Sequence, residues 1–194
     1  VWYKNPGTRE GSWTRYVIAH QLTPKDNVCI AARDIDGDGK VEVAIGAQWA
    51  PGETKNPAES GAVFYLYPTS DDRTQPWKAV RLHHEVTVHR MHWIKTTDNA
   101  FQLVVLPLHG LNNVNSEGTP VNMIVFDVPK DRKSNWPYQL VDTRMHATHN
   151  FQPIEVPNRL AGLAVGGKQG VQLFLHGANG WAPSGNWFVS GHSI

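Results

Sequence analysis

Apolar residues along this chain occur in short runs of strand length rather than at helical spacing. Residues 62–67, reading Ala-Val-Phe-Tyr-Leu-Tyr, form the clearest run, and residues 103–106 and 123–128 have the same character. β-Branched and aromatic runs bounded by Gly, Pro and Asn are typical of β-strands. Residues 13–18 alternate large and polar side chains, which predicts a strand with one buried face. The pattern therefore predicts an all-β chain of many short strands.

The predicted strands recur in the same order three times. A tryptophan opens the outermost strand of each unit, at Trp77, Trp136 and Trp187, and we interpret these side chains as packing residues of the repeat. Units of four strands repeating every roughly 50 to 60 residues are typical of β-propeller blades. The predicted antiparallel blades are residues 28–82, 88–141 and 147–190, preceded by the outer strand of another blade at 13–18.

About three blades form only part of a ring, because closed propellers have at least about four. The sequence begins at Val1, without an initiator methionine or a signal peptide. We therefore expect a fragment, or a processed or partly observed chain. The remaining blades would lie in the same chain or in another one. The localisation stays open, with a secreted or extracellular protein favoured.

An acidic loop between two predicted strands is the strongest candidate for a metal site. Residues 34–46 contain aspartates at three alternate positions, Asp34, Asp36 and Asp38. Gly37 and Gly39 stand on either side of Asp38, and Glu42 follows four residues after it. Oxygen ligands at one point suit a hard cation, calcium or magnesium. An EF-hand loop needs Glu at its twelfth position, which is Ile45 here, and the flanks are strands, so that motif is excluded. The alternative is an acidic hairpin turn that holds no ion.

Composition and charge narrow the range of functions. The chain has 194 residues, with 17 Gly, 13 Pro and 8 Trp, which fits many strands and turns. A net charge of +1 without a basic cluster gives no reason to expect a nucleic-acid partner. No apolar run has the length of a membrane span. Cys29 is the only cysteine, so an internal disulfide is excluded and a small core residue is the simplest interpretation.

The motif Asp34-Ile35-Asp36-Gly37-Asp38-Gly39 followed by Glu42 resembles the calcium loops of FG-GAP or VCBS repeat propellers. Residues 88–93, residues 103–110 and His149-Asn150-Phe151 resemble, more narrowly, the propeller domain of the aldos-2-ulose dehydratase group. That resemblance implies a seven-bladed propeller joined to cupin domains and a zinc-assisted elimination on a carbohydrate. Neither the missing blades nor a cupin segment is present in this sequence.

Blade topology predicts which histidines share a face. Loops from second to third strands, and connections between blades, lie on the face opposite the acidic loop. His89 and His149 would begin innermost strands of successive blades, and His109 would end a second strand between them. Three imidazoles there would suit zinc with an open fourth position, polarising a sugar carbonyl while a neighbouring histidine takes the α-proton. The alternative is that they are polar rim residues or partners of loop backbone.

A sugar-binding surface on the same face would complete such a site. Trp49 would stack on a pyranose ring, with polar contacts from Asn112, Asn113 and Lys168; alternatively, Trp49 packs under its own loop. The sequence therefore leaves three interpretations of function. One is a metal-dependent carbohydrate lyase (hydro-lyase) acting on a keto-sugar in the axial cleft. The second is a non-catalytic, calcium-stabilised propeller that binds glycan or protein, and the third is a purely structural assembly module.

Overall fold

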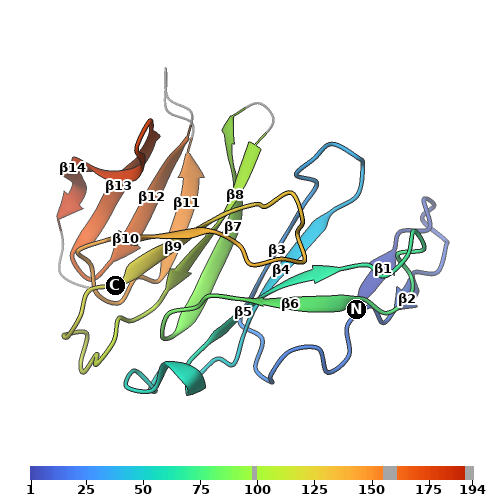
Figure 1. Ribbon diagram of the computed structural model, residues 1–194, viewed down its shortest axis with the longest axis horizontal. Helices are drawn as coiled ribbons and strands as arrows, with labels where there is room; N and C mark the ends of the chain where they lie inside the picture. Colours follow the sequence, from blue (N-terminus) through green and yellow to red (C-terminus); the bar gives the residue numbers. More distant parts are fainter. Residues whose placement is uncertain (98–99, 155–160, 191–194) are drawn as a thin grey trace.

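The computed structural model, which describes residues 1–97, 100–154 and 161–190, is built almost entirely of antiparallel strands (Figure 1). Three four-stranded sheets follow one another along the chain, each with its strands in sequence order. The first sheet contains β3 (Cys29–Arg33), β4 (Glu42–Ala47), β5 (Ala62–Tyr67) and β6 (Lys78–Leu82). The second contains β7 (Val88–Thr97), β8 (Ala100–Pro107), β9 (Asn122–Asp127) and β10 (Tyr138–Asp142). The third contains β11 (Asn150–Ile154), β12 (Gly162–Gly167), β13 (Gly170–Gly177) and β14 (Gly180–Ser190).

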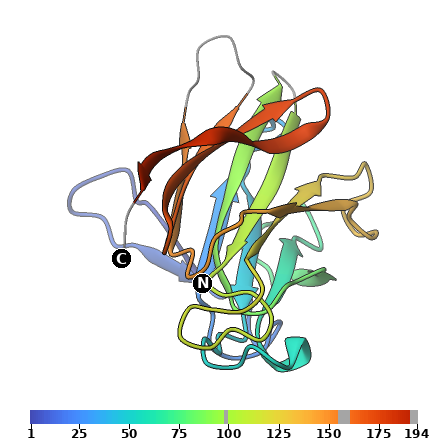
Figure 2. The ribbon, with the colours of Figure 1, turned by 90° about the vertical axis from the view of Figure 1, so that its left-hand side faces the viewer.

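The predicted fold class is confirmed, because every sheet is a simple antiparallel meander as in a propeller blade. The sheets lie side by side as a fan, and the third sheet comes to the front when the molecule is turned (Figures 1 and 2). The fan does not close into a ring within the described residues. A single 3-10 turn, η1 (Pro57–Glu59), interrupts the long β4–β5 connection. No helix in the described part of the chain is long and apolar enough to cross a membrane.

The central strands of the first two sheets are apolar on both faces because each of these sheets packs against a neighbour on either side. On β8, Leu103 and Val105 join the core shared with the first sheet, whereas Val104 and Leu106 join the core shared with the third. All four side chains are fully buried. Side chains on a strand alternate between its faces, so a continuous apolar run supplies two cores at once. This explains why the sequence shows short apolar runs instead of alternation.

The N-terminal segment forms a separate two-stranded ribbon. The strand expected at 13–18 is β2 (Thr14–Tyr16), and it pairs with β1 (Trp2–Lys4), which the sequence analysis did not identify. Trp2 and Tyr16 pack against a third apolar cluster that covers the other face of the first sheet and includes Trp77. The ribbon thus covers the face on which a preceding blade would pack.

The repeated tryptophans are equivalent in two of the three sheets. The Trp77 indole donates a hydrogen bond from Nε1 to the carbonyl oxygen of Arg73, and Trp136 does the same to Arg132, each at 3.0 Å. The third sheet differs, because a tight hairpin joins β13 to β14 and the outer strand already begins at Gly180. Trp181 is its buried indole, 3 % exposed, while Trp187 only borders the core. The expected equivalence of Trp187 with Trp77 is therefore wrong, because no long loop precedes that strand.

Candidate functional site: an acidic loop and a histidine face

The acidic loop between β3 and β4 is folded around the side chain of Asp34. Gly37 and Gly39 both have φ +80°, a conformation that glycine adopts without strain. This turns their N–H groups inward, and Asp34 accepts them at 2.7 and 2.9 Å. Burial raises the pKa of Asp34, but the backbone N–H groups outweigh it, so the pKa lies below its usual value. The loop therefore keeps a carboxylate charged at its centre.

Three of the four predicted acidic ligands come together. Among the described residues, Asp34, Asp36 and Glu42 form the one group of potential metal ligands whose donor atoms all lie within 4.8 Å of one another. Asp38 lies outside this group, and its carboxylate accepts the backbone N–H of Lys40 at 2.8 Å. Glu42 is 5 % exposed, and burial raises its pKa despite the N–H of Ile35 and the charge of Arg132. Carboxylates in this arrangement are suited to a hard cation.

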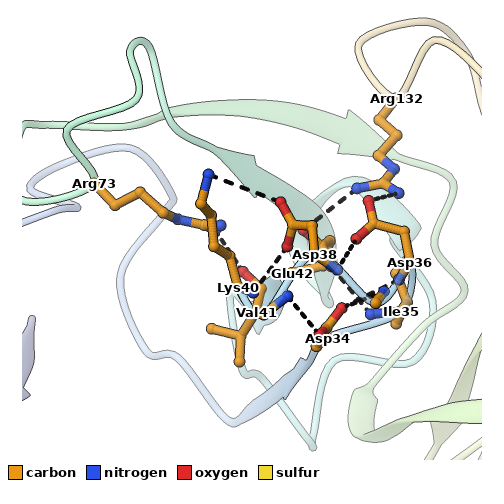
Figure 3. A network of polar contacts seen from close by, with 11 residues as sticks. Asp34, Ile35, Asp36, Asp38, Lys40, Val41, Glu42, Arg73 and Arg132 are labelled. Atoms are coloured by element: carbon orange, nitrogen blue, oxygen red, sulfur yellow. Dashed lines mark hydrogen bonds and ion pairs between the residues drawn. The ribbon is translucent and has the colours of Figure 1, made fainter.

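Arg132, which sequence reasoning did not identify, reaches this group from the second sheet (Figure 3). Its guanidinium nitrogens lie 2.8 Å from Asp36 Oδ2 and 3.3 Å from Glu42 Oε1. Arg73 occupies the equivalent place in the first sheet, but it donates to the carbonyl of Val41 and pairs with no carboxylate of the described residues. The acidic loop is therefore also an ionic contact between neighbouring sheets.

On the opposite face, the rings of His89 and His149 meet edge to face, with centroids 4.8 Å apart. Trp49 stacks on His89 at 4.9 Å. His89 is 6 % exposed, and neither of its buried ring nitrogens has a hydrogen-bond partner among the described residues. Burial, reinforced by the charge of Arg90 and by His149 and His109, lowers the pKa of His89 to about 4. A neutral imidazole with two unused buried nitrogens is unusual unless a ligand satisfies it.

Thr87 ties His109 to the same region. Its hydroxyl accepts the backbone N–H of His109 at 2.7 Å and donates to the carbonyl of His109 at 3.0 Å. Thr87 is fully buried and has φ +56°, which is rare for a β-branched residue. It stands two residues before His89, so one side chain fixes both segments. Burial also lowers the pKa of His109, whose Nδ1 is buried without a partner.

The residues present fit zinc in part. Buried, neutral and unpartnered imidazole nitrogens are the donors that zinc prefers. The donor atoms of His89, His109 and His149, however, do not all lie within 4.8 Å of one another. At least one ring would have to turn for all three to bind the same ion, and His149 is exposed enough to do so.

The predicted sugar-binding residues lie in loops on this face, in different environments. Trp49 is half-buried against His89, so one face of its ring is occupied by the imidazole. Lys168 pairs with Glu117 and donates to the carbonyl of Ser116 at 3.2 Å. Asn112 is exposed, whereas the side-chain nitrogen of Asn113 is buried without a partner.

A cleft of about 500 Å³ opens beside the histidines, on the second and third sheets. None of the predicted site residues lines it. Its polar lining includes Arg90 and Asn150, which directly follow His89 and His149 in the sequence. The sequence signal was present, because these residues flank the two histidines, but only the fold shows that they face a common space.

Residues 30–66 match the FG-GAP repeat. The matched segment runs from β3 through the acidic loop, β4 and η1 to β5. It covers the part of the chain on which the resemblance to FG-GAP propellers was based. No curated protein matches the chain significantly. The narrower resemblance to aldos-2-ulose dehydratase has no support in these comparisons and stays a prediction.

Proposed function

We propose that the histidine face binds a keto-sugar and, with zinc, eliminates water from it, so that the chain is the propeller part of a carbohydrate hydro-lyase. One observation carries this proposal: both ring nitrogens of His89 are buried against His149 and Trp49, with no hydrogen-bond partner in the part of the chain that the structure describes. Leaving two polar atoms in this state is unfavourable unless a ligand satisfies them. The FG-GAP match supports only the propeller context.

His89, His109 and His149 are the residues that would hold the metal. When bound, zinc would supply Lewis-acid polarisation of the sugar carbonyl. Burial keeps the pKa of His89 and His109 low, so both rings offer lone pairs at neutral pH. A neighbouring histidine that does not bind the metal would accept the α-proton of the sugar.

The neighbouring loops would orient the sugar. The buried, unpartnered amide nitrogen of Asn113 offers a donor for a hydroxyl group. The exposed Asn112 would contact the rim of the ligand. Lys168 would have to exchange its contact with Glu117, and Trp49 would present the ring face that His89 does not cover.

The test is an assay on the intact chain with added zinc and a keto-sugar such as glucosone. Elimination of water next to a carbonyl gives an unsaturated ketone, which is followed by its ultraviolet absorbance. We expect product with the wild type and with His83→Gln, because His83 lies between blades and is paired with Glu85 at 2.8 Å. His89→Gln abolishes product formation. Equal rates in the His89→Gln and wild-type proteins would refute the proposal.

The second candidate is a non-catalytic, calcium-stabilised propeller that binds glycan or protein. It is favoured by the group formed by Asp34, Asp36 and Glu42 within the matched FG-GAP segment. Calcium or magnesium would share two of these carboxylates with Arg132. A calcium-dependent rise in melting temperature that Asp34→Asn removes, with no zinc uptake and no product, would favour this candidate over the lyase.

A further inference from the structure

Arg90, in the cleft between the second and third sheets, has no acidic partner among the residues that the structure describes. Its Nε donates to Asn150 Oδ1 at 3.1 Å, and Nη1 donates to the carbonyl of His89 at 3.4 Å. Both acceptors are neutral, and none of the ion pairs among the described residues includes Arg90. Arg132, in contrast, has two carboxylate partners. The guanidinium of Arg90 therefore retains an uncompensated charge and unused donors at the cleft wall.

The described residues that line the cleft around Arg90 provide donors and apolar surface but no acid. Asn150 and Gln152 contribute carboxamide groups to the lining, and the Gln152 amide donates only to the carbonyl of Pro153, at 3.4 Å. His92 packs edge to face on Phe151 at 4.9 Å, and burial together with Arg90 lowers the pKa of His92. The imidazole is thus neutral at pH 7, and within the described part of the chain Arg90 is the only lining residue with a fixed charge.

We propose that this cleft binds a sugar carboxylate, such as a uronic acid, through Arg90 and Asn150. A planar guanidinium matches a carboxylate in a two-pronged contact, and one cation suits one negative charge better than a phosphate dianion. Phe151, Val171 and Ala164 provide apolar surface for the C–H face of a pyranose. The volume of about 500 Å³ lies in the range of small-molecule sites. The inference rests on this geometry and holds whether or not the histidine face binds zinc.

The test is isothermal titration of the intact chain with glucuronate, glucose and glucose 6-phosphate. EDTA is present, so that a carboxylate cannot bind through a metal ion. We expect glucuronate to bind most tightly. Raising NaCl from about 50 to 500 mM should lower the affinity for glucuronate but not the affinity for glucose, because salt screens charge. If glucose binds as tightly as glucuronate, or the phosphate binds more tightly, the assignment is overturned.

Variants locate the contact. Arg90→Gln should lower the affinity for glucuronate at least about tenfold, because a charge-assisted pair is lost, and leave the affinity for glucose unchanged. Arg90→Lys retains part of the affinity, since the charge remains without the planar fork. The matched control is Arg81→Gln, which removes an exposed arginine on β6, outside the cleft lining. An unchanged glucuronate affinity in Arg90→Gln, with a circular dichroism spectrum like the wild type, contradicts the proposal. If Arg90→Gln does not fold, the proposal is tested by the salt dependence of glucuronate binding to the wild type.

Discussion

Replacing Arg132 by Gln tests whether the acidic loop is an ionic contact between blades. The change removes the guanidinium 2.8 Å from Asp36 and 3.3 Å from Glu42. Asp36 is 41 % exposed, so its pair with Arg132 contributes at most about 1 kcal/mol. Glu42 is 6 % exposed at its side chain, and a buried carboxylate that loses its counter-charge costs more, up to about 3 kcal/mol. Because Ile35 N–H still binds Glu42 at 3.2 Å, we expect a loss of about 2 kcal/mol in the free energy of unfolding.

The loss depends on pH with a definite sign. Burial raises the pKa of Glu42, and the nearby Arg132 lowers it, so Arg132→Gln raises this pKa further. The folded variant then binds more protons than the unfolded chain between the unfolded and folded pKa values of Glu42. Its stability relative to the wild type therefore recovers as the pH falls through that window. A protonated Glu42 is neutral and needs no counter-charge.

Urea unfolding followed by tryptophan fluorescence, at pH 7 and at about pH 4.5 with EDTA, measures both effects. Arg73→Gln is the matched control, because Arg73 holds the same turn position without pairing to a carboxylate. The double variant Arg132→Gln with Glu42→Gln should lose less than the sum of the single losses. An Arg132→Gln loss no larger than that of Arg73→Gln, or one independent of pH, would refute the reasoning.

Three further predictions concern other parts of the molecule. Gly46→Ala should destabilise the contact between the first two sheets by about 1–3 kcal/mol, because a Cβ there would lie 2.5 Å from Cys29 Sγ, whereas Gly52→Ala, with nothing within 4 Å, should change the melting temperature little. Burial raises the pKa of the Cys29 thiol to about 12, so iodoacetamide at pH 8.5 should alkylate native protein roughly a hundredfold more slowly than unfolded protein, and equal rates would contradict this. Since the pKa of His89 is lowered to about 4, the unfolded chain binds more protons than the folded chain between about pH 6.5 and 4. The free energy of unfolding of metal-free protein should therefore fall by about 3 kcal/mol as the pH falls through this window. The same decline in a His89→Gln variant would show that His89 is not its cause.

The sequence predicted the central strands of the first two sheets well because both of their faces are packed. The apolar runs had to be continuous, and residues 62–67 coincide with β5. The edges were predicted less well, because their residues satisfy only one core. β1 was not identified, and the outer strand of the last sheet begins at Gly180 rather than near Trp187.

The shape of the acidic loop was predictable because one segment of sequence determines it, whereas contacts between separate loops were not. Gly37 and Gly39 sufficed to fold the acidic loop around Asp34. Arg132 was not predicted because it comes from another sheet, 96 residues along the chain from Asp36. Arg73 and Arg132 hold equivalent positions before Trp77 and Trp136, but Arg132 pairs with the carboxylates of the acidic loop, whereas Arg73 donates to the carbonyl of Val41.

Topology predicted that the histidines share a face, but sequence alone does not give their contacts. His89 and His149 meet at 4.8 Å because innermost strands of successive sheets lie next to one another. Arg90 and Asn150 were not predicted, since nothing in their spacing indicates a cleft.

Zinc titration of the intact, EDTA-treated and dialysed chain tests the central claim most directly. We predict that each chain binds one zinc ion, that His89→Gln abolishes this binding, and that His83→Gln leaves it intact. The absence of zinc uptake by the wild type, or the same uptake by the His89→Gln variant, would contradict the account of the histidine face.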